Sequence, residues 1–200
     1  PIDMSNITGK IDFYYSKDST RIPVILVYRK DLKLDGNNPV LLTAYGGFNI
    51  GISPSYYGSY APFINRGGVV VEPGIRGGDE YGEKWHEDGM LLNKQNCFDD
   101  FNACAEWLIR EKYTCPARLV AEGGSNGGLL MGAVATQRPD LYKAILCAVP
   151  LIDMVRFHRF LIARYWIPEY GSSDNEKDFR NLLSYSPYHH VRSGINAPTM

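Results

Sequence analysis

A single serine lies between glycines where a short apolar run gives way to a helical pattern. Residues 119–131 have the sequence LVAEGGSNGGLLM, with the apolar run before Gly123 and an apolar helical face after Gly127. Gly-x-Ser-x-Gly at a turn from strand to helix is the motif known as the nucleophile elbow. The turn exposes the serine hydroxyl on strained backbone, and a side chain at either flanking glycine would collide with the neighbouring strand or helix. The pattern therefore predicts that Ser125 is a nucleophile.

The same glycines could instead form a phosphate-binding loop or an ordinary turn. A phosphate-binding loop would need a lysine after the glycines, or a second glycine pattern with an acidic residue beyond it, and neither is present. The elbow is therefore the favoured interpretation. In an elbow, the backbone N–H of Asn126 and the start of the following helix face the developing oxyanion. A second donor is expected near Tyr45, where Gly46 and Gly47 form either a simple turn or a loop that directs the phenol O–H toward the same oxygen.

A serine hydroxyl is a weak nucleophile and needs a base, which in turn needs a carboxylate that orients it. In this arrangement the acid and the histidine follow the serine along the chain, on loops after later strands. None of the downstream candidates has the expected position; they are Asp140, Asp153, Asp174, Asp178, His158, His189 and His190. We therefore expect the acid and the histidine to lie beyond Met200, and the 200-residue chain alone to be inactive.

Alternating strands and helices must position these groups. The predicted strands are short and apolar, and they cover residues 11–15 and 22–28 (a hairpin), 39–45, 68–72, 118–121, 144–149 and the start of one more strand at 197–200. The predicted helices cover residues 96–113 with Asn96 as the cap, 126–137, 154–163 and 175–183. This alternation predicts an α/β fold with a mostly parallel sheet and helices on both faces, in one domain spanning residues 1–200.

Composition argues against several classes of function. The formal net charge is −1, and no apolar run approaches the length of a membrane-spanning helix, so neither a nucleic acid nor a membrane is expected as a partner. The four cysteines, at positions 97, 104, 115 and 147, contain no C-x-x-C pair, which favours free thiols over a disulfide framework or a zinc site. We therefore predict a cytoplasmic protein without a metal or another cofactor.

Several longer motifs resemble the prolyl oligopeptidase family. They are YGGFNI at 45–50, IRGG at 75–78 with EYGE at 80–83 and WH at 85–86, NKQNCFDDF at 93–101, GGSNGGLL at 123–130, QRPDL at 137–141 and YSP at 185–187. The resemblance extends from about the first hairpin to the end of the chain. It implies an α/β-hydrolase fold whose C-terminal strands are missing, and a serine endopeptidase that cleaves short proline-containing peptides on the carboxyl side of proline. It also implies a β-propeller domain outside these residues.

The resemblance further implies roles for individual residues. Ser125 matches the nucleophile, Tyr45 the oxyanion tyrosine and Asn126 the residue that supplies the oxyanion amide. The residues that match the pocket for the substrate proline are Trp166, whose ring would stack on the proline, Phe48, Ile162 and Tyr170. A pyrrolidine ring is flat, apolar and lacks an N–H, so an aromatic-lined pocket can bind it by stacking and burial. Residues 49–66 diverge from the family, and no role is carried over to them.

The sequence leaves alternatives open. Trp166 could be an ordinary core aromatic residue. Glu169, the only acid close to Trp166, could select a basic substrate residue as in related oligopeptidases, or the protein could be an esterase or a relative with dipeptidyl specificity. Because no base is identified, the chain could also be a catalytically incomplete fragment that acts as a binding module.

Overall fold

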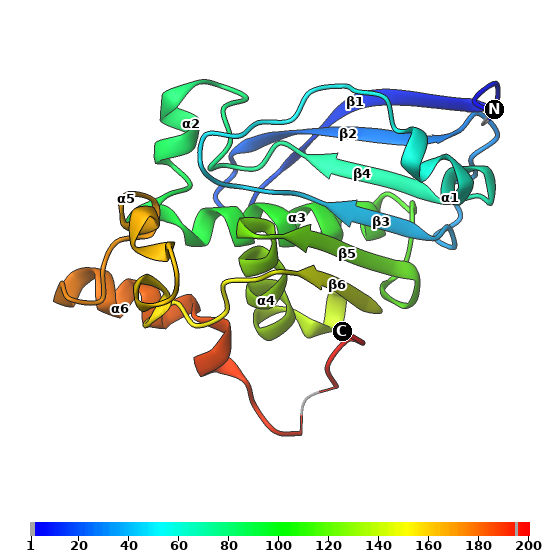
Figure 1. Ribbon diagram of the computed structural model, residues 1–200. Coiled ribbons are helices and arrows are strands. Elements are labelled where there is room, and N and C mark those ends of the chain that lie inside the picture. The colour runs from blue at the N-terminus through cyan, green and yellow to red at the C-terminus, as the bar shows by residue number, and fades with distance from the viewer. Residues whose placement is uncertain (1–2, 195) are drawn as a thin grey trace.

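The computed structural model describes residues 3–194 and 196–200, and a twisted sheet runs through it (Figure 1). In this part of the chain the sheet has six strands in the order β1-β2-β4-β3-β5-β6. Their bounds are β1 Ile7–Tyr15, β2 Arg21–Arg29, β3 Val40–Thr43, β4 Val69–Pro73, β5 Leu119–Gly124 and β6 Ala144–Ala148. β1 and β2 form the predicted antiparallel hairpin, and β2 is also antiparallel to β4, whereas the remaining neighbours are parallel. The predicted mostly parallel sheet is therefore confirmed.

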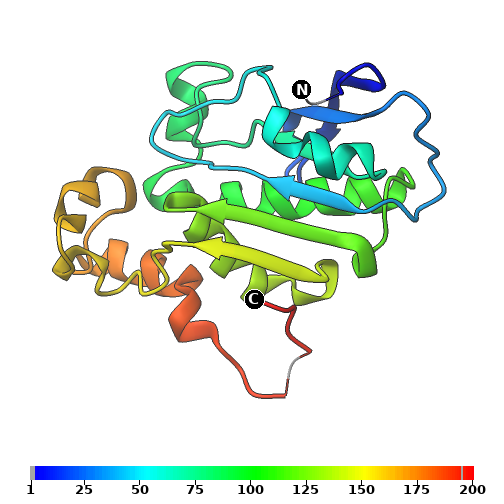
Figure 2. The ribbon, with the colours of Figure 1, turned by 45° about the vertical axis from the view of Figure 1, so that its right-hand side comes forward.

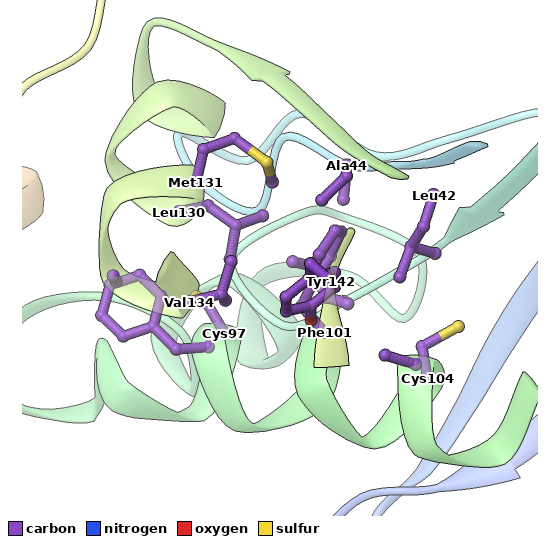
Figure 3. Close-up of a cluster of buried hydrophobic side chains, with 14 of the residues drawn as sticks. Leu42, Ala44, Cys97, Phe101, Cys104, Leu130, Met131, Val134 and Tyr142 are labelled. Atoms are coloured by element: carbon purple, nitrogen blue, oxygen red, sulfur yellow. The ribbon is translucent and has the colours of Figure 1, made fainter. Parts of the chain in front are cut away.

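One face of the sheet carries the two long helices and the larger hydrophobic core. These helices are α3 (Gln95–Arg110) and α4 (Asn126–Gln137). Figure 3 shows side chains such as Phe101 of α3, Val134 of α4 and Leu42 of β3 gathered between the helices and the sheet, and all three are fully buried. α4 is buried along nearly its whole length, as expected for a helix that is apolar all round.

The opposite face of the sheet has a smaller core. There Ile25, Val27 and Val70, the neighbours in sequence of residues that face the larger core, pack with Ile64 of the short helix α1 (Ala61–Asn65). The turned view in Figure 2 shows α1 and α3 on opposite sides of the strands. Helices on both faces are therefore confirmed.

After β6 the chain leaves the sheet and forms short elements beyond the carboxyl ends of the parallel strands (Figure 1). They include α5 (Ile167–Tyr170) and α6 (Glu176–Tyr185). The predicted helix over residues 154–163 is wrong, because this segment forms 3-10 turns at Phe157–Arg159 and Ala163–Trp166. Leu161, between the turns, has a φ of 47° and is 99% exposed. A residue in the left-handed conformation interrupts a right-handed helix. Without a continuous helix, the apolar side chains of this segment do not share one face, and some are buried while others are exposed.

The caps of two helices differ from one another. Asn175 is the N-cap of α6, and its side chain accepts hydrogen bonds from the N–H groups of Lys177 and Asp178. Asn96, in contrast, is not the predicted cap of α3. It lies within the first turn of α3, where its side chain donates to the carbonyl of Asp88 (2.8 Å).

The remaining elements are short. They are α2 (Glu83–Glu87) and 3-10 turns at Gly58–Tyr60, Leu91–Asn93, Pro116–Arg118, Pro139–Leu141 and Pro187–His190. A parallel bridge joins Ala144 to Thr199, so the segment predicted to begin another strand lies beside β6. None of the helices described for this chain is both long and apolar enough to cross a bilayer.

Candidate active site

Ser125 lies at the turn between β5 and α4, on strained backbone. Its φ and ψ are 57° and −117°, a region that residues with a side chain rarely occupy. Its N–H donates to the carbonyl of Ala148 at the end of β6 (3.0 Å), which ties the turn to the neighbouring strand. The predicted strained turn from strand to helix is therefore confirmed.

The two motif glycines around Ser125 are required by close approaches of backbone. A Cβ on Gly123 would lie 2.4 Å from the carbonyl oxygen of Gly127, and a Cβ on Gly127 would lie 2.7 Å from the carbonyl oxygen of Ala44. The obstructing atoms belong to the backbone and cannot rotate away. Gly124, between them, would make only ordinary contacts at 3.6 Å. The predicted collision at the flanking glycines is therefore confirmed.

Asn126 connects the start of α4 to the loop that follows β3. It is buried, its Nδ2 donates to the carbonyl of Tyr45 (2.7 Å), and its Oδ1 accepts from the hydroxyl of Tyr170 (2.7 Å). Burial raises the pKa of Tyr170 well above its ordinary value, so this hydroxyl stays a neutral donor. The backbone N–H of Asn126 belongs to the first turn of α4, where N–H groups have no acceptor within the helix. This geometry suits the oxyanion role predicted for that amide.

Residues 45–48, which we call the oxyanion loop after the role predicted for Tyr45, bring two further predicted residues next to Tyr170. The ring centroids of Tyr45 and Phe48 are 6.3 Å apart with planes tilted by 46°, and Phe48 meets the ring of Tyr170 edge-on at 5.7 Å. Asn126 hydrogen bonds to both tyrosines. Four of the predicted site residues therefore form one connected group at the start of α4, directly after Ser125.

Trp166 and Ile162 line a separate, largely apolar hollow of about 340 Å³. Trp166 is half-buried and Ile162 is exposed. Phe157 lines the same hollow and packs edge-on against Tyr170, with 5.3 Å between ring centroids. The structure thus divides the predicted proline pocket into two groups that Phe157 joins. Sequence reasoning missed Phe157 because it assigned that segment to a helix.

The carboxylate of Glu169 binds groups of its own chain. Glu169 is 5% exposed, its Oε1 accepts from the N–H of Phe48 (3.0 Å) and lies 3.7 Å from Nζ of Lys94, and its Oε2 lies 2.8 Å from Nε2 of His86. Both oxygens of this buried carboxylate already have partners, so neither is accessible to a basic side chain of a substrate. The alternative in which Glu169 selects arginine or lysine therefore loses its structural basis.

His86 and Lys94 were not among the residues predicted from the sequence. Both lie within motifs that resemble the family, but no local spacing indicates that they meet Glu169. We refer to Glu169, His86 and Lys94 together as the carboxylate network.

Most of the downstream histidines and aspartates are engaged elsewhere, whereas Nδ1 of His158 is buried without a hydrogen-bond partner among the described residues. Nδ1 of His189 lies 2.8 Å from Oγ of Ser186, and Nδ1 of His190 lies 2.9 Å from the carbonyl oxygen of Ser186. Three of the aspartates bind near neighbours, in the pairs Asp140–Arg138, Asp153–Arg156 and Asp178–Ser172. In residues 3–194 and 196–200, no hydrogen bond joins Oγ of Ser125 to a histidine. The location of the acid and the base beyond Met200 stays a prediction.

All four cysteines are free thiols. Cys97 is buried, and its Sγ donates to the carbonyls of Arg76 (2.9 Å) and Gly89 (3.0 Å). Burial raises the pKa of the Cys97 thiol to about 11. Within the described ranges, no three His, Cys, Asp or Glu side chains come together as metal ligands.

Comparison with known proteins places this site in a family. Residues 54–200 match the Prolyl oligopeptidase family. The prolyl endopeptidase of Dictyostelium discoideum is 49% identical over 187 residues, which cover 92% of this chain and 25% of that protein. The prolyl endopeptidase of Elizabethkingia meningoseptica is 44% identical over 195 residues, which cover 97% of this chain and 28% of that protein. The chain therefore spans about a quarter of the length of these curated relatives.

Solved structures give the same result. One from a mechanistic analysis of two prolyl endopeptidases superposes with a TM-score of 0.97 at 52% identity, covering 99% of this chain and 29% of that one. Prolyl oligopeptidase B of Galerina marginata superposes with a TM-score of 0.94 at 34% identity, covering 98% and 28%. These matches confirm the predicted α/β-hydrolase fold. Since the elbow at Ser125 lies within the matched residues, both the fold and the sequence assign this chain to the prolyl oligopeptidase family.

Proposed function

We propose that this chain is part of a serine endopeptidase that hydrolyses short peptides on the carboxyl side of proline, through an acyl-enzyme at Ser125. The observation that carries the proposal is the elbow, where Ser125 lies on strained backbone directly before Asn126, whose side chain hydrogen bonds to Tyr45 and Tyr170. The relatives named prolyl endopeptidases support the substrate class. The proposal concerns the longer protein, since those relatives are about four times the length of this chain.

The proposed reaction begins with attack of Ser125 Oγ on the carbonyl carbon of the substrate proline. The Oγ–C bond forms, the hydroxyl proton passes to a base, and the carbonyl oxygen becomes an oxyanion. The backbone N–H of Asn126 and the phenol of Tyr45 donate to that oxyanion. Collapse of the intermediate breaks the C–N bond, and the leaving amine takes the proton from the base. Water then attacks the acyl-enzyme by the same steps and releases the peptide acid.

The proposed proline pocket consists of Trp166, Phe48, Ile162 and Tyr170. The ring of Trp166 stacks on the pyrrolidine, and the edge-on pair of Phe48 and Tyr170 provides a second wall. The apolar lining of the hollow at Trp166 and Ile162 supports this assignment. The nitrogen of a proline residue in a peptide carries no proton, so the pocket needs no hydrogen-bond acceptor for it.

The acid and the histidine of the triad are proposed to lie outside these 200 residues, as is a β-propeller domain. The order of the triad along the chain and the greater length of the relatives support both points. A cytoplasmic location is proposed on the basis of four free thiols. Fractionation of cells that express the full-length protein tests the location, and recovery outside the cytosolic fraction would contradict it.

Active-site labelling tests the central proposal. A fluorophosphonate probe should label the full-length protein at Ser125, and Ser125→Ala should abolish both the labelling and the cleavage of proline peptides. Ser53→Ala, at an exposed position of the loop before α1, is the matched control and should leave labelling unchanged. Labelling that persists on another serine in Ser125→Ala would overturn the proposal. The isolated 200-residue chain should retain little activity, because a serine without a base and an orienting acid loses roughly 10⁴–10⁶-fold in rate.

A further inference from the structure

The oxyanion loop and the residue after it have a strained backbone. Gly46 has a φ of 68°, and Phe48 and Asn49 have φ values of 57° and 58°. Two consecutive residues with side chains in the left-handed region cost free energy, and such a conformation persists only when surrounding contacts enforce it. Tyr45 lies at the start of this loop, so the position of its phenol depends on those contacts.

Three side chains from distant segments supply the contacts. Asn126 donates to the carbonyl of Tyr45 (2.7 Å), Nζ of Lys94 donates to the carbonyl of Gly46 (2.9 Å), and the N–H of Phe48 donates to Oε1 of Glu169 (3.0 Å). Side chains thus hold the main chain of the loop at three of its four residues. Two backbone hydrogen bonds add to them, from the N–H of Ile50 to the carbonyl of Gly47 (3.1 Å) and from the N–H of Asn49 to the carbonyl of Gly77 (3.0 Å). The fourth, Gly47, is closely packed against side chains, since a Cβ there would lie 2.6 Å from Nδ2 of Asn126 and 3.0 Å from Oε1 of Glu169.

The carboxylate network joins three helices behind this loop. Lys94 immediately precedes α3, His86 belongs to α2, and Glu169 belongs to α5. Lys94 and Glu169 are 1% and 5% exposed, and buried charges of this kind are tolerated because they are paired. Removing the carboxylate would leave the ammonium of Lys94 buried with the Gly46 carbonyl as its hydrogen-bond acceptor. Glu169 is therefore the group on which the geometry of the network depends.

The position of Glu169 in α5 relates the loop to the proposed pocket. Tyr170 is the next residue of the same helix, and Trp166 directly precedes the helix. We propose that Glu169 is a positioning residue that couples the proline pocket to the oxyanion donor Tyr45, so that proline in the pocket raises the rate of acylation as well as the affinity. This inference rests on the proposed function and extends it.

The first test replaces Glu169 in the full-length protein. Glu169→Ala should lower kcat for a proline peptide by roughly 10–100-fold with little change in KM, since a displacement of about 1 Å in a reacting geometry can have an effect of this size. Glu169→Gln keeps an acceptor for the N–H of Phe48 and should restore much of the rate. Glu176→Ala is the matched control, because Glu176 is an exposed residue of α6 paired with Arg180, and its kcat should match that of the parent.

A double-mutant cycle distinguishes positioning from general destabilisation. Tyr45→Phe should lower kcat strongly in the parent but only slightly in Glu169→Ala, because a misplaced phenol contributes little. A peptide aldehyde ending in prolinal, which forms a hemiacetal with Ser125, should bind Glu169→Ala more weakly by about the factor lost in kcat/KM. A peptidyl pyrrolidine amide, which fills the pocket without reacting, should bind both proteins equally.

Coupling to the pocket has its own readout. In the parent, changing the substrate proline to alanine should lower kcat as well as raise KM, whereas in Glu169→Ala the two substrates should have similar kcat values. Losses from Tyr45→Phe and Glu169→Ala that multiply, or an unchanged kcat in Glu169→Ala, overturn the inference. If the alanine variant does not fold, the same cycle with Glu169→Leu, which fills the space but offers no acceptor to the N–H of Phe48, decides. Failure of Ser125 labelling in the parent would instead overturn the proposed function.

Discussion

The nucleophile elbow and the oxyanion loop both contain a residue with a side chain in the left-handed region, but different kinds of contact surround the two. At the elbow, Ser125 has a φ of 57°, and the backbone of Gly127 and Ala44 leaves no room for a Cβ at the motif glycines Gly123 and Gly127. In the oxyanion loop, Phe48 has the same φ of 57°, but side chains such as Glu169 enforce it. Backbone atoms therefore crowd the elbow, whereas side chains from separate helices hold the oxyanion loop.

This difference predicts how each region responds to change. Backbone atoms in a sheet cannot move without disturbing the strands, so a collision at the elbow has no local relief. The ends of side chains can shift by a few tenths of an ångström, so the oxyanion loop should respond in a graded way. The following variants, made in the full-length protein, test that comparison.

The largest effect is expected at the elbow. Gly123→Ala places a methyl group 2.4 Å from the carbonyl of Gly127, which should destabilise the fold by about 2–4 kcal/mol and lower kcat/KM by more than about 10³-fold. Thermal unfolding and peptide cleavage measure the two losses. Gly124→Ala is the control, because its Cβ makes only ordinary contacts at 3.6 Å. Equal losses in the two variants would contradict the view that backbone collision enforces the elbow.

The next effect concerns the oxyanion donor. Tyr45→Phe removes one hydroxyl and should lower kcat by about 10²–10³-fold, because a donor to the developing oxyanion acts mainly in the transition state. KM should change little. Steady-state kinetics on a proline peptide provide the measurement, and an unaltered kcat would mean that Tyr45 only packs at the strand end.

The proline pocket should give a somewhat smaller loss. Trp166→Ala removes an aromatic contact and should lower kcat/KM for proline substrates. The corresponding loss of transition-state stabilisation is about 1.5–3 kcal/mol. The kcat/KM for substrates with alanine before the scissile bond should fall less, so the ratio of kcat/KM between proline and alanine substrates becomes smaller. Cleavage of peptides with Pro, Ala or Arg before the scissile bond provides the comparison. A parent that prefers Arg, and that loses this preference in Glu169→Gln, would reverse the assignment.

The smallest loss is expected where only side-chain atoms obstruct. Gly47→Ala places its Cβ 2.6 Å from Nδ2 of Asn126 and 3.0 Å from Oε1 of Glu169, and both groups can shift. We expect kcat to fall roughly fivefold, which corresponds to a rise of about 1 kcal/mol in the activation free energy, with a small change in thermal stability. If Gly47→Ala proved as damaging as Gly123→Ala, the distinction between the two regions would not hold.

The same distinction explains how much of the molecule the sequence predicts. The elbow is a local pattern, and the helix predicted over residues 126–137 has those bounds in the structure. The strands are predicted because apolar runs between turn residues are also local. The segment around Phe157 is not predicted, since a left-handed Leu161 leaves no periodic signal.

The carboxylate network could not be predicted at all. The hydrogen bond of Glu169 to Phe48 spans 121 positions of the chain, and its contact with His86 spans 83. Spacing in one sequence indicates which residues share a face of one element, but not which distant elements meet. The sequence therefore identified the groups proposed to react and missed those that hold the oxyanion loop.

The buried thiol of Cys97 bears on how this site withstands oxidants. Peroxide attacks the thiolate, and with a pKa of about 11 only roughly one Cys97 side chain in 10⁴ is a thiolate at pH 7. A sulfinic acid at this position would add two oxygens and a charge where Sγ now donates to the carbonyls of Arg76 and Gly89. Because Cys97 is buried, oxidative damage should begin at the half-buried Cys115 and Cys147 rather than at Cys97.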